Sequence, residues 1–353
     1  MTIIQTLSNS LATAYLHDDG SVTTSGDPDY GGDSRAVQHL LKDVTELFST
    51  DGAFAVLKAD STVITWGDSS DGGDSSSVQH LLTDVATIAS NSGAFAALKA
   101  DGTVITWGDS DWGGNSHAIQ HLLNEIITIT SSYGAFAAIK SDGTVITWGD
   151  SSDGGDSSPV QHLLKGITAI ASNNGAFAAL KDDGAVVTWG DPSDGGDSSA
   201  VQHLLKDVTE LFSTYDAFAA LKTDGTVVTW GHSNTGADSS AVQDLLTDVT
   251  TIASSNSAFA ALKTNGTVIT WGNSINGGNS KAVQHLLINV TKIFNNRYAF
   301  AALKTDGTIV TWGHAKRGGD SSAVQNNLIN IETIIAHEDR FTAITSDGTE
   351  ISW

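Results

Sequence analysis

A unit of 41 residues repeats along the whole chain without insertion or deletion, and its core reads A-F-A-A-L-K-x-D-G-T-V-x-T-W-G. Its tryptophan recurs every 41 positions, at Trp66, Trp107, Trp148, Trp189, Trp230, Trp271, Trp312 and Trp353. Counting back 41 positions from Trp66 gives Ser25, which lies in a degenerate first copy. A fixed period of this length is typical of repeat proteins, in which each unit buries its apolar face against its neighbours. We therefore predict a single repeat domain over 1–353, with nine units that end near Ser25 and near each of the eight tryptophans.

The copy that ends at Trp107 shows what one unit folds into. Residues 94–99 form a short apolar run, and the Asp101-Gly102 pair that follows is a strong reverse-turn signal. Residues 103–107 are β-branched or aromatic, so the two runs predict a β-hairpin. Residues 85–90 are a candidate for a third strand. Each unit is thus expected to contain three short strands.

A polar segment connects each unit to the next one. In the segment Gly-Gly-Asp-Ser-Ser-Ser-Val-Gln-His-Leu-Leu, either Asp74 or Ser75 can cap a short helix. Val78, Leu81 and Leu82 have the spacing of one apolar helix face, so we expect about two helical turns that bury these three side chains. Three-stranded sheets with two partly apolar faces are suited to radial stacking as the blades of a β-propeller.

The run from Gly93 to Gly108, G-A-F-A-A-L-K-A-D-G-T-V-I-T-W-G, followed by D-S-D-W-G-G, resembles the repeat of the regulator of chromosome condensation superfamily. The short period is similar in length to that of the secreted bacterial β-lactamase inhibitor protein type of that superfamily, whose blades are three-stranded. The resemblance covers all nine units. It implies a β-propeller whose function is carried by loops on one rim or face, and it transfers no activity.

Two features of this chain depart from that family. Members typically have seven blades, and nine units are present here. The first unit has Thr13 and Ser25 where the other units have Phe and Trp, and such degenerate end units suit both the seam of a ring and the cap of an open array. The expected fold is therefore all-β, a β-propeller of about nine three-stranded blades with short helices in the connections, and an open repeat solenoid is the alternative.

Composition excludes several classes of partner and site. The chain has 40 acidic and 17 basic side chains, a formal net charge of -23, which opposes binding to nucleic acid or to an anionic membrane surface. It contains no cysteine, so disulfides and thiolate sites are excluded. The N-terminal residues lack the basic and apolar regions of a signal peptide, and no apolar stretch is long enough for a membrane helix. We expect a monomer that is cytoplasmic or exported by a route without a signal peptide.

The fixed residues of the unit indicate a fold and no chemistry. The repeated Phe and Trp side chains are expected to pack between adjacent sheets. Histidines recur in register on the solvent side of the predicted helices, at His39, His80, His121, His162, His203 and His285. The D-x-x-D-G-G-D run that starts at Asp68 does not have the spacing of a calcium-binding loop. The G-x-S-x-G motif of hydrolases, the Walker-type and dinucleotide-binding motifs and the H-E-x-x-H motif of zinc proteases are absent. We predict no metal site, no cofactor and no enzymatic activity.

The units differ mainly in two short segments, one before the Ala-Phe strand and one after Trp-Gly. In a three-stranded meander these two segments lie at the same end of the sheet, whereas the constant Asp-Gly turns lie at the opposite end. Loops on a rigid scaffold concentrate recognition residues, although drift in unrestrained loops would also produce variation. As candidate binding residues we name the aromatic and acidic side chains of these segments: Tyr30, Trp112, Tyr133, Tyr215, Tyr298, Asp71 and Asp111.

We therefore predict a non-catalytic protein-binding scaffold whose variable acidic face recognises a basic or aromatic-rich protein surface. One alternative, implied by the family resemblance, is an effector that regulates a small GTPase as an exchange factor does. The unbroken 41-residue period leaves no room for the extra wedge hairpin of such an effector. The other alternative is a structural spacer or array protein.

Overall fold

The computed structural model describes residues 1–353 and contains nine three-stranded antiparallel sheets, each with its strands in chain order. The first strands are β1 (Ile3–Ser8), β4 (Val44–Ser49), β7 (Val85–Ser90), β10 (Ile126–Ser131), β13 (Ile167–Ser172), β16 (Val208–Ser213), β19 (Val249–Ser254), β22 (Val290–Asn295) and β25 (Ile331–Ala336). The middle strands are β2 (Ala12–His17), β5 (Ala53–Lys58), β8 (Ala94–Lys99), β11 (Ala135–Lys140), β14 (Ala176–Lys181), β17 (Ala217–Lys222), β20 (Ala258–Lys263), β23 (Ala299–Lys304) and β26 (Phe341–Thr345). The third strands are β3 (Val22–Gly26), β6 (Val63–Gly67), β9 (Val104–Gly108), β12 (Val145–Gly149), β15 (Val186–Gly190), β18 (Val227–Gly231), β21 (Val268–Gly272), β24 (Ile309–Gly313) and β27 (Glu350–Ser352). The predicted fold class, an all-β propeller of nine three-stranded blades, is confirmed.

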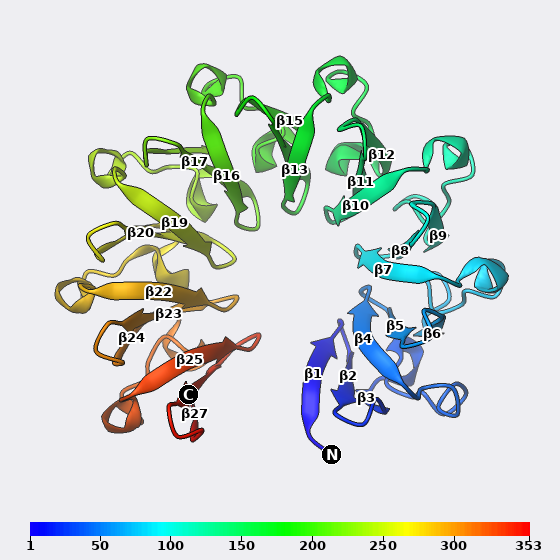
Figure 1. Cartoon of the computed structure of the whole chain (residues 1–353), viewed down its shortest axis with the longest axis horizontal. Coiled ribbons are helices and arrows are strands. Elements are labelled where there is room, and N and C mark those ends of the chain that lie inside the picture. The colour runs from blue at the N-terminus through cyan, green and yellow to red at the C-terminus, as the bar shows by residue number, and fades with distance from the viewer. The chain divides into compact units, whose positions relative to one another are not determined.

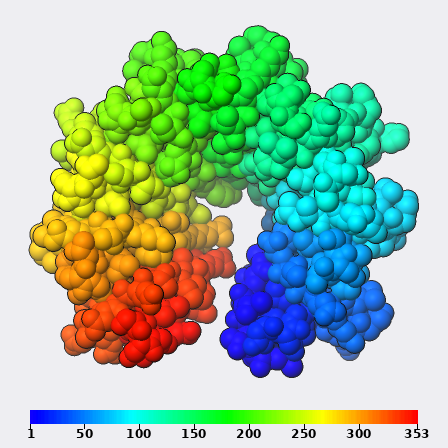
Figure 2. Space-filling model, viewed as in Figure 1, coloured from blue at the N-terminus to red at the C-terminus, as the bar shows by residue number.

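The chain forms two compact parts. The first consists of Met1–Lys181 and Trp189–Asp191, and the second of Asp182–Thr188 and Pro192–Trp353. Figure 1 shows the blades following one another along each part, with the first strands of neighbouring blades side by side. In the space-filling view the neighbouring blades within each part are in close contact (Figure 2). A single repeat domain over 1–353 stays a prediction.

The middle strand of each blade is buried on both faces, which explains its continuous apolar sequence. In β5, Phe54 and Val56 pack against the blade before, and Ala53, Ala55 and Leu57 pack against the blade after. Because strand residues alternate between faces, one short run of apolar residues contributes to two interfaces. Phe54 is 0% exposed, and burying a side chain of this size contributes about 1.5 to 3 kcal/mol.

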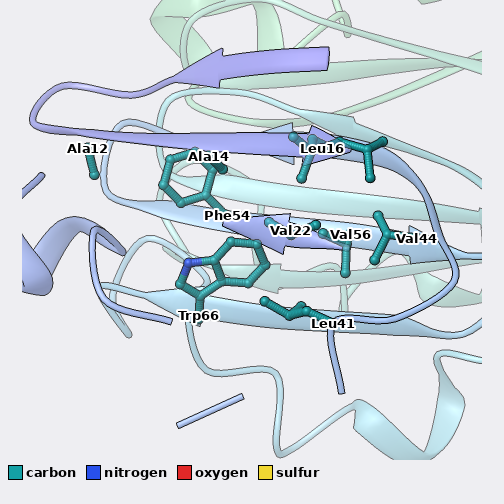
Figure 3. Packing of buried hydrophobic residues seen from close by; sticks show 10 residues of the cluster. Ala12, Ala14, Leu16, Val22, Leu41, Val44, Phe54, Val56 and Trp66 are labelled. Carbon is teal, nitrogen blue, oxygen red and sulfur yellow. The ribbon is translucent and has the colours of Figure 1, made fainter. Parts of the chain in front are cut away.

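The repeated tryptophan connects each blade to the one before it. The ring of Trp66 stacks on Phe54 at 5.4 Å between centroids, and both rings pack against the first blade (Figure 3). The indole Nε1 of Trp66 also donates a hydrogen bond to the carbonyl oxygen of Gly31, at 2.9 Å. Seven further tryptophans make the same bond to a glycine 35 positions earlier, from Trp107 to Trp353. The Phe and Trp positions are therefore core positions between sheets, as predicted.

The glycine that accepts this bond is required by its backbone and by its neighbours. Gly72 has a φ of 96°, in the left-handed region that disfavours other residues. A Cβ atom built on Gly72 would lie 2.6 Å from the ring of Phe95 in the next blade. The first glycine of the Gly-Gly pair thus permits close packing between blades.

The connections contain only single helical turns. Those that follow the third strands are η1 (Pro28–Tyr30), η4 (Ser151–Gly155), η6 (Pro192–Asp194), η8 (Ser233–Thr235), η10 (Ser274–Gly278) and η12 (Ala315–Arg317). Those that precede the first strands are η2 (Gln79–Leu81), η3 (Gln120–Leu122), η5 (Gln161–Leu163), η7 (Gln202–Leu204), η9 (Gln243–Leu245), η11 (Gln284–Leu286) and η13 (Gln325–Asn327). No helix in the structure has both the length and the apolar character needed to cross a membrane.

The predicted two-turn helix with three buried apolar residues is wrong. Neither Asp74 nor Ser75 caps the helix: its N-cap residue is Val78, without a side-chain cap bond, and the Asp74 carboxylate accepts from the Ser76 N–H at 2.9 Å in the turn before the helix. Leu82 is fully buried, but Val78 is only partly buried and Leu81 is 39% exposed. The helix has a single turn of three residues, too short for the 3.6-residue period to place all three side chains on one buried face.

A side-chain network replaces the missing helical turn. The Gln79 amide donates to the carbonyl oxygen of Val63 at 2.9 Å, and it accepts from the hydroxyl of Ser75 at 2.8 Å. This network ties the connection to the third strand of its own blade, which explains the glutamine of the repeat.

Candidate binding face

The two variable segments meet at one end of each blade, as predicted from the strand order. The turn between the first and middle strands contacts the connection that follows the third strand: the Asp109 N–H donates to the carbonyl oxygen of Gly93 at 2.9 Å. The constant turn around Asp101 lies at the other end of the blade, where its carboxylate accepts from the Thr103 N–H and hydroxyl. We call the end with the variable segments the tip face.

A buried polar residue at the start of each turn holds the two variable segments together. In the third blade, the Asn91 amide donates to the carbonyl oxygen of Trp112 at 2.7 Å and accepts from the N–H groups of Gly93 and Ala94. We call these positions latch residues. Equivalent bonds to the carbonyl oxygen 21 positions later are made by Asn9, Thr50, Ser132, Thr214, Ser255 and Asn296. The variable loops are therefore fixed to the scaffold in both parts.

The residue after each latch residue forms a second, unexpected connection between blades. Its N–H donates to the carbonyl oxygen of the residue 41 positions later, as from Asp51 to Ser92 at 2.7 Å and from Ser92 to Tyr133 at 3.0 Å. We call these residues the tip row. In the first part the tip row is Ser10, Asp51, Ser92, Tyr133 and Asn174, and in the second part it is Tyr215, Asn256, Arg297 and Glu338. A single hydrogen bond of this kind sets neighbouring backbones about 5 Å apart, so the side chains form a closely spaced row.

In the second variable segment, which follows Trp-Gly, one residue covers the turn between the first and middle strands. We call these residues the cover residues: Tyr30, Asp71, Trp112 and Asp153 in the first part, and Asp194, Thr235, Asn276 and Arg317 in the second. A Cβ atom on Gly93 would lie 2.9 Å from the Trp112 ring, and one on Gly52 would lie 2.4 Å from the Asp71 carboxylate. The small residue after the tip row thus makes space for the cover residue.

The structure brings Trp112 and Tyr133 together. Their ring centroids are 5.0 Å apart and the rings are tilted by 52°. Tyr133 is 42% exposed, whereas the Trp112 ring is half-buried against its own blade and the next one. Asp111 is exposed beside this pair. Three of the predicted binding residues therefore form one continuous surface on the first part.

The other predicted aromatic residues lie at separate places. Tyr30 is half-buried against the cluster that contains Phe54, so part of its ring belongs to the core. Tyr215 lies in the tip row of the second part and is 44% exposed. Tyr298 is half-buried, with the guanidinium of Arg317 at 4.2 Å from its ring centroid. Sequence reasoning missed Arg297 and Arg317, although their charge distinguishes them from the same positions of every other unit.

Carboxylates crowd the tip face of the first part. Burial, together with the charges of Asp68, Asp51 and Asp109, raises the pKa of Asp71 above its ordinary value. Burial and the charges of two neighbouring carboxylates likewise raise the pKa of Asp153. These neighbouring carboxylates repel one another, and a cation that approached them would reduce the repulsion.

The D-x-x-D-G-G-D loop uses its first carboxylate for its own structure. Asp68 accepts hydrogen bonds from the Ser70 N–H at 2.8 Å and the Ser70 hydroxyl at 2.6 Å, and these bonds lower the pKa of Asp68. The structure contains no group of three His, Asp or Glu side chains arranged to hold a metal ion. The six in-register histidines are all exposed, as expected from their positions.

No protein-family model and no curated protein matches the chain. Among solved structures it is similar to Prp20p from Saccharomyces cerevisiae, with 15% identity, 83% of this chain and 75% of that chain covered, and a TM-score of 0.42. Human WBSCR16 has 15% identity, coverages of 87% and 88%, and a TM-score of 0.40. The computationally designed protein Ika8 has 16% identity, coverages of 88% and 96%, and a TM-score of 0.38.

These similarities concern the fold alone. Prp20 is also described as yeast RCC1. The likeness to the β-lactamase inhibitor protein type, based on repeat length, stays a prediction.

Proposed function

We propose that the chain is a non-catalytic protein-binding scaffold and that its tip face recognises a basic or aromatic-rich protein surface. The observation that carries the proposal is the Trp112–Tyr133 pair, two contacting aromatic rings on adjacent blades at the end where the repeat varies. Most other units have small, polar or acidic residues at these two positions, and no other unit has an aromatic residue at both the tip-row and the cover position of such a pair.

The aromatic pair has the properties of an interface hot spot. Trp and Tyr are enriched among residues that dominate binding energies, because they bury a large area and lose little conformational entropy. Here the entropy loss is reduced further, since Asn91 holds the Trp112 backbone and the tip row holds the Tyr133 backbone on both sides. A surface that is fixed before binding loses less freedom when the complex forms.

The carboxylates around the pair favour a cationic partner. Burial and three neighbouring carboxylates raise the pKa of Asp71, so a negative charge on this side chain is disfavoured there. A Lys or Arg side chain of a partner would reduce this repulsion, and opposite charges across an interface also accelerate association. The net charge of -23 acts in the same direction over longer distances.

The test compares two double variants that use only residues found elsewhere in the repeat. The tip-face variant, Trp112→Asp with Tyr133→Ser, introduces the residue types that other units have at the equivalent positions, Asp71 and Ser92. The matched control, Thr103→Ala with Asp142→Asn, changes two constant turns at the opposite end of the blades. It introduces the residue types that other units have at the equivalent positions, Ala185 and Asn265. Immobilised wild-type and variant chains are exposed to an extract of the source cells, and the retained proteins are quantified by mass spectrometry.

We expect proteins that the wild-type chain and the opposite-end control retain and that the tip-face variant loses. Equal retention of all proteins by the three chains would contradict the proposal. Circular dichroism spectra that are the same for the three chains would exclude unfolding as the reason for any loss.

A further inference from the structure

Basic residues are concentrated in the eighth blade of this acidic chain. The four arginines are Arg35, Arg297, Arg317 and Arg340, so three of them lie within the last 57 residues (353 minus 296). Arg297 occupies the tip row and Arg317 the cover position, with Lys316 directly before it. The preceding unit has Asn256 and Asn276 at the two arginine positions. One unit therefore presents positive charge where the others present neutral or acidic side chains.

Both arginines lie close to one aromatic ring. The guanidinium carbon of Arg317 lies 4.2 Å from the ring centroid of Tyr298, and that of Arg297 lies 5.8 Å from the same centroid. The His314 ring approaches the Tyr298 ring edge-on, with centroids 6.3 Å apart. Stacking on an aromatic face engages the plane of a guanidinium and leaves its N–H edge able to donate hydrogen bonds.

The backbone under this cluster is fixed in the same way as in the third blade. The Asn296 side chain accepts from the Tyr298 N–H at 2.8 Å and donates to the carbonyl oxygen of Arg317 at 2.9 Å. The Arg297 carbonyl oxygen accepts from the Asn256 N–H at 3.0 Å. Latch and tip-row bonds thus fix the backbone from which the two arginine side chains extend.

A carboxylate of the chain itself already contacts this cluster. Glu338, the next residue of the tip row, lies 3.4 Å from Nη1 of Arg297, and these side chains are 60% and 47% exposed. No hydrogen bond or ion pair of the Arg317 guanidinium is present, so its donors face solvent. Pairs as exposed as that of Arg297 and Glu338 contribute little to stability and can exchange partners.

We propose that Arg297, Tyr298 and Arg317 form a binding site for an acidic peptide segment of a protein partner. Two forked donors next to one aromatic ring suit carboxylates that alternate along an extended chain, with the stem of one residue packed against the ring. The net charge of -23 disfavours polyanions such as nucleic acid, because only this part of the surface would attract them. This section of the tip face takes the opposite partner chemistry from the acidic surface of the first part, so the proposal goes beyond the proposed function.

The probe is a fluorescein-labelled (Gly-Glu)₄ peptide, and its neutral control is (Gly-Gln)₄. Fluorescence anisotropy at low ionic strength measures binding to the full chain. The variants Arg297→Asn and Arg317→Asn each introduce the residue of the preceding unit, so the fold tolerates them. Lys281→Ser is the matched control, because it removes one exposed positive charge from a connection away from this cluster and introduces the residue found in the next unit.

We expect the acidic peptide to bind and the neutral peptide to bind at least tenfold more weakly. Each arginine variant should weaken binding about fivefold, the upper range for an exposed ion pair, and the control should leave it unchanged. Glu338→Gln should strengthen binding about twofold, because it removes the internal competitor of Arg297. A merely structural role of the cluster would not produce that gain.

Three results would overturn this inference: equal binding of the two peptides, equal weakening by Lys281→Ser, or displacement of the acidic peptide by inorganic phosphate at a lower concentration than by glutamate. The Trp112→Asp and Tyr133→Ser double variant separates the two proposals. It should keep full affinity for the acidic peptide even though it loses the proteins that the tip face of the first part retains.

Discussion

The latch residues make the sharpest prediction about how the variable loops are held. Asn91 is 7% exposed and makes three hydrogen bonds, one to the carbonyl oxygen of Trp112 and one each from the N–H groups of Gly93 and Ala94. Asn91→Ala removes all three. Asn91→Ser should keep two, since Ser132 makes the equivalent pair of bonds at 2.7 and 3.2 Å.

The expected cost follows from that count. A hydrogen bond contributes about 1 kcal/mol net, so Asn91→Ala should lower the free energy of unfolding by about 3 kcal/mol. The Ala94 N–H and the Trp112 carbonyl oxygen lose their side-chain partner in Asn91→Ala, so we expect each lost bond to cost no less than this average. Asn91→Ser should cost about 1 kcal/mol, because only the bond from the Gly93 N–H is lost.

Two measurements check these values. Urea unfolding monitored by tryptophan fluorescence gives the overall cost, and hydrogen exchange of the Ala94 amide reports on the third blade alone. Repeat arrays can unfold in segments, so the amide is the more direct probe. If Asn91→Ala and Asn91→Ser have the same stability and the same exchange rate, the latch does not fix the loops.

Two further predictions concern the core and the charge of the tip face. Trp107→Phe removes the indole bond to the Gly72 carbonyl and part of a buried ring, so it should cost about 3 kcal/mol in urea unfolding. Trp353→Phe should cost less, because that ring is only partly buried, and equal costs would contradict a role in packing between blades. Asp71→Asn should raise stability at pH 7 by about 0.5 kcal/mol, since burial and neighbouring carboxylates raise the pKa of Asp71 in the folded protein. The folded chain then binds a proton at Asp71 more tightly than the unfolded chain does. The extra stability of Asp71→Asn should therefore disappear as pH falls below 3.8, where Asp71 is protonated in both states. A gain in stability that persists at pH 3 would show that the charge of Asp71 is not its cause.

The strands could be predicted because their signals are local. The expected ranges 85–90 and 94–99 coincide with β7 and β8, since apolar runs bounded by an Asp-Gly turn determine both ends. The connection was predicted less well. Its leucines have helical spacing, but the side chain of Gln79 bonds back to the third strand and the helix stops after one turn. A polar residue that binds a distant backbone group leaves no periodic signal in the sequence.

The tip face was predicted in outline only. Strand order alone places both variable segments at one end, and exposed aromatic residues such as Tyr133 could be recognised there. The tip row could not be predicted, because its bonds join backbone atoms and any side chain can occupy its positions. The arginine pair around Tyr298 could have been found from its departure in charge, but its convergence on one ring depends on the latch at Asn296.

The dissociation constant of a protein captured by the tip face tests the central claim most directly. It is measured by surface plasmon resonance for the wild-type chain, for Trp112→Asp with Tyr133→Ser, and for the opposite-end control Thr103→Ala with Asp142→Asn. If the aromatic pair is a hot spot, its loss should raise the dissociation constant by about 30-fold or more, which corresponds to about 2 kcal/mol, and the control should leave it unchanged. A tip-face variant that binds as tightly as the wild-type chain, or a control that binds as weakly as the tip-face variant, would contradict the claim that the variable end of the blades is the binding surface.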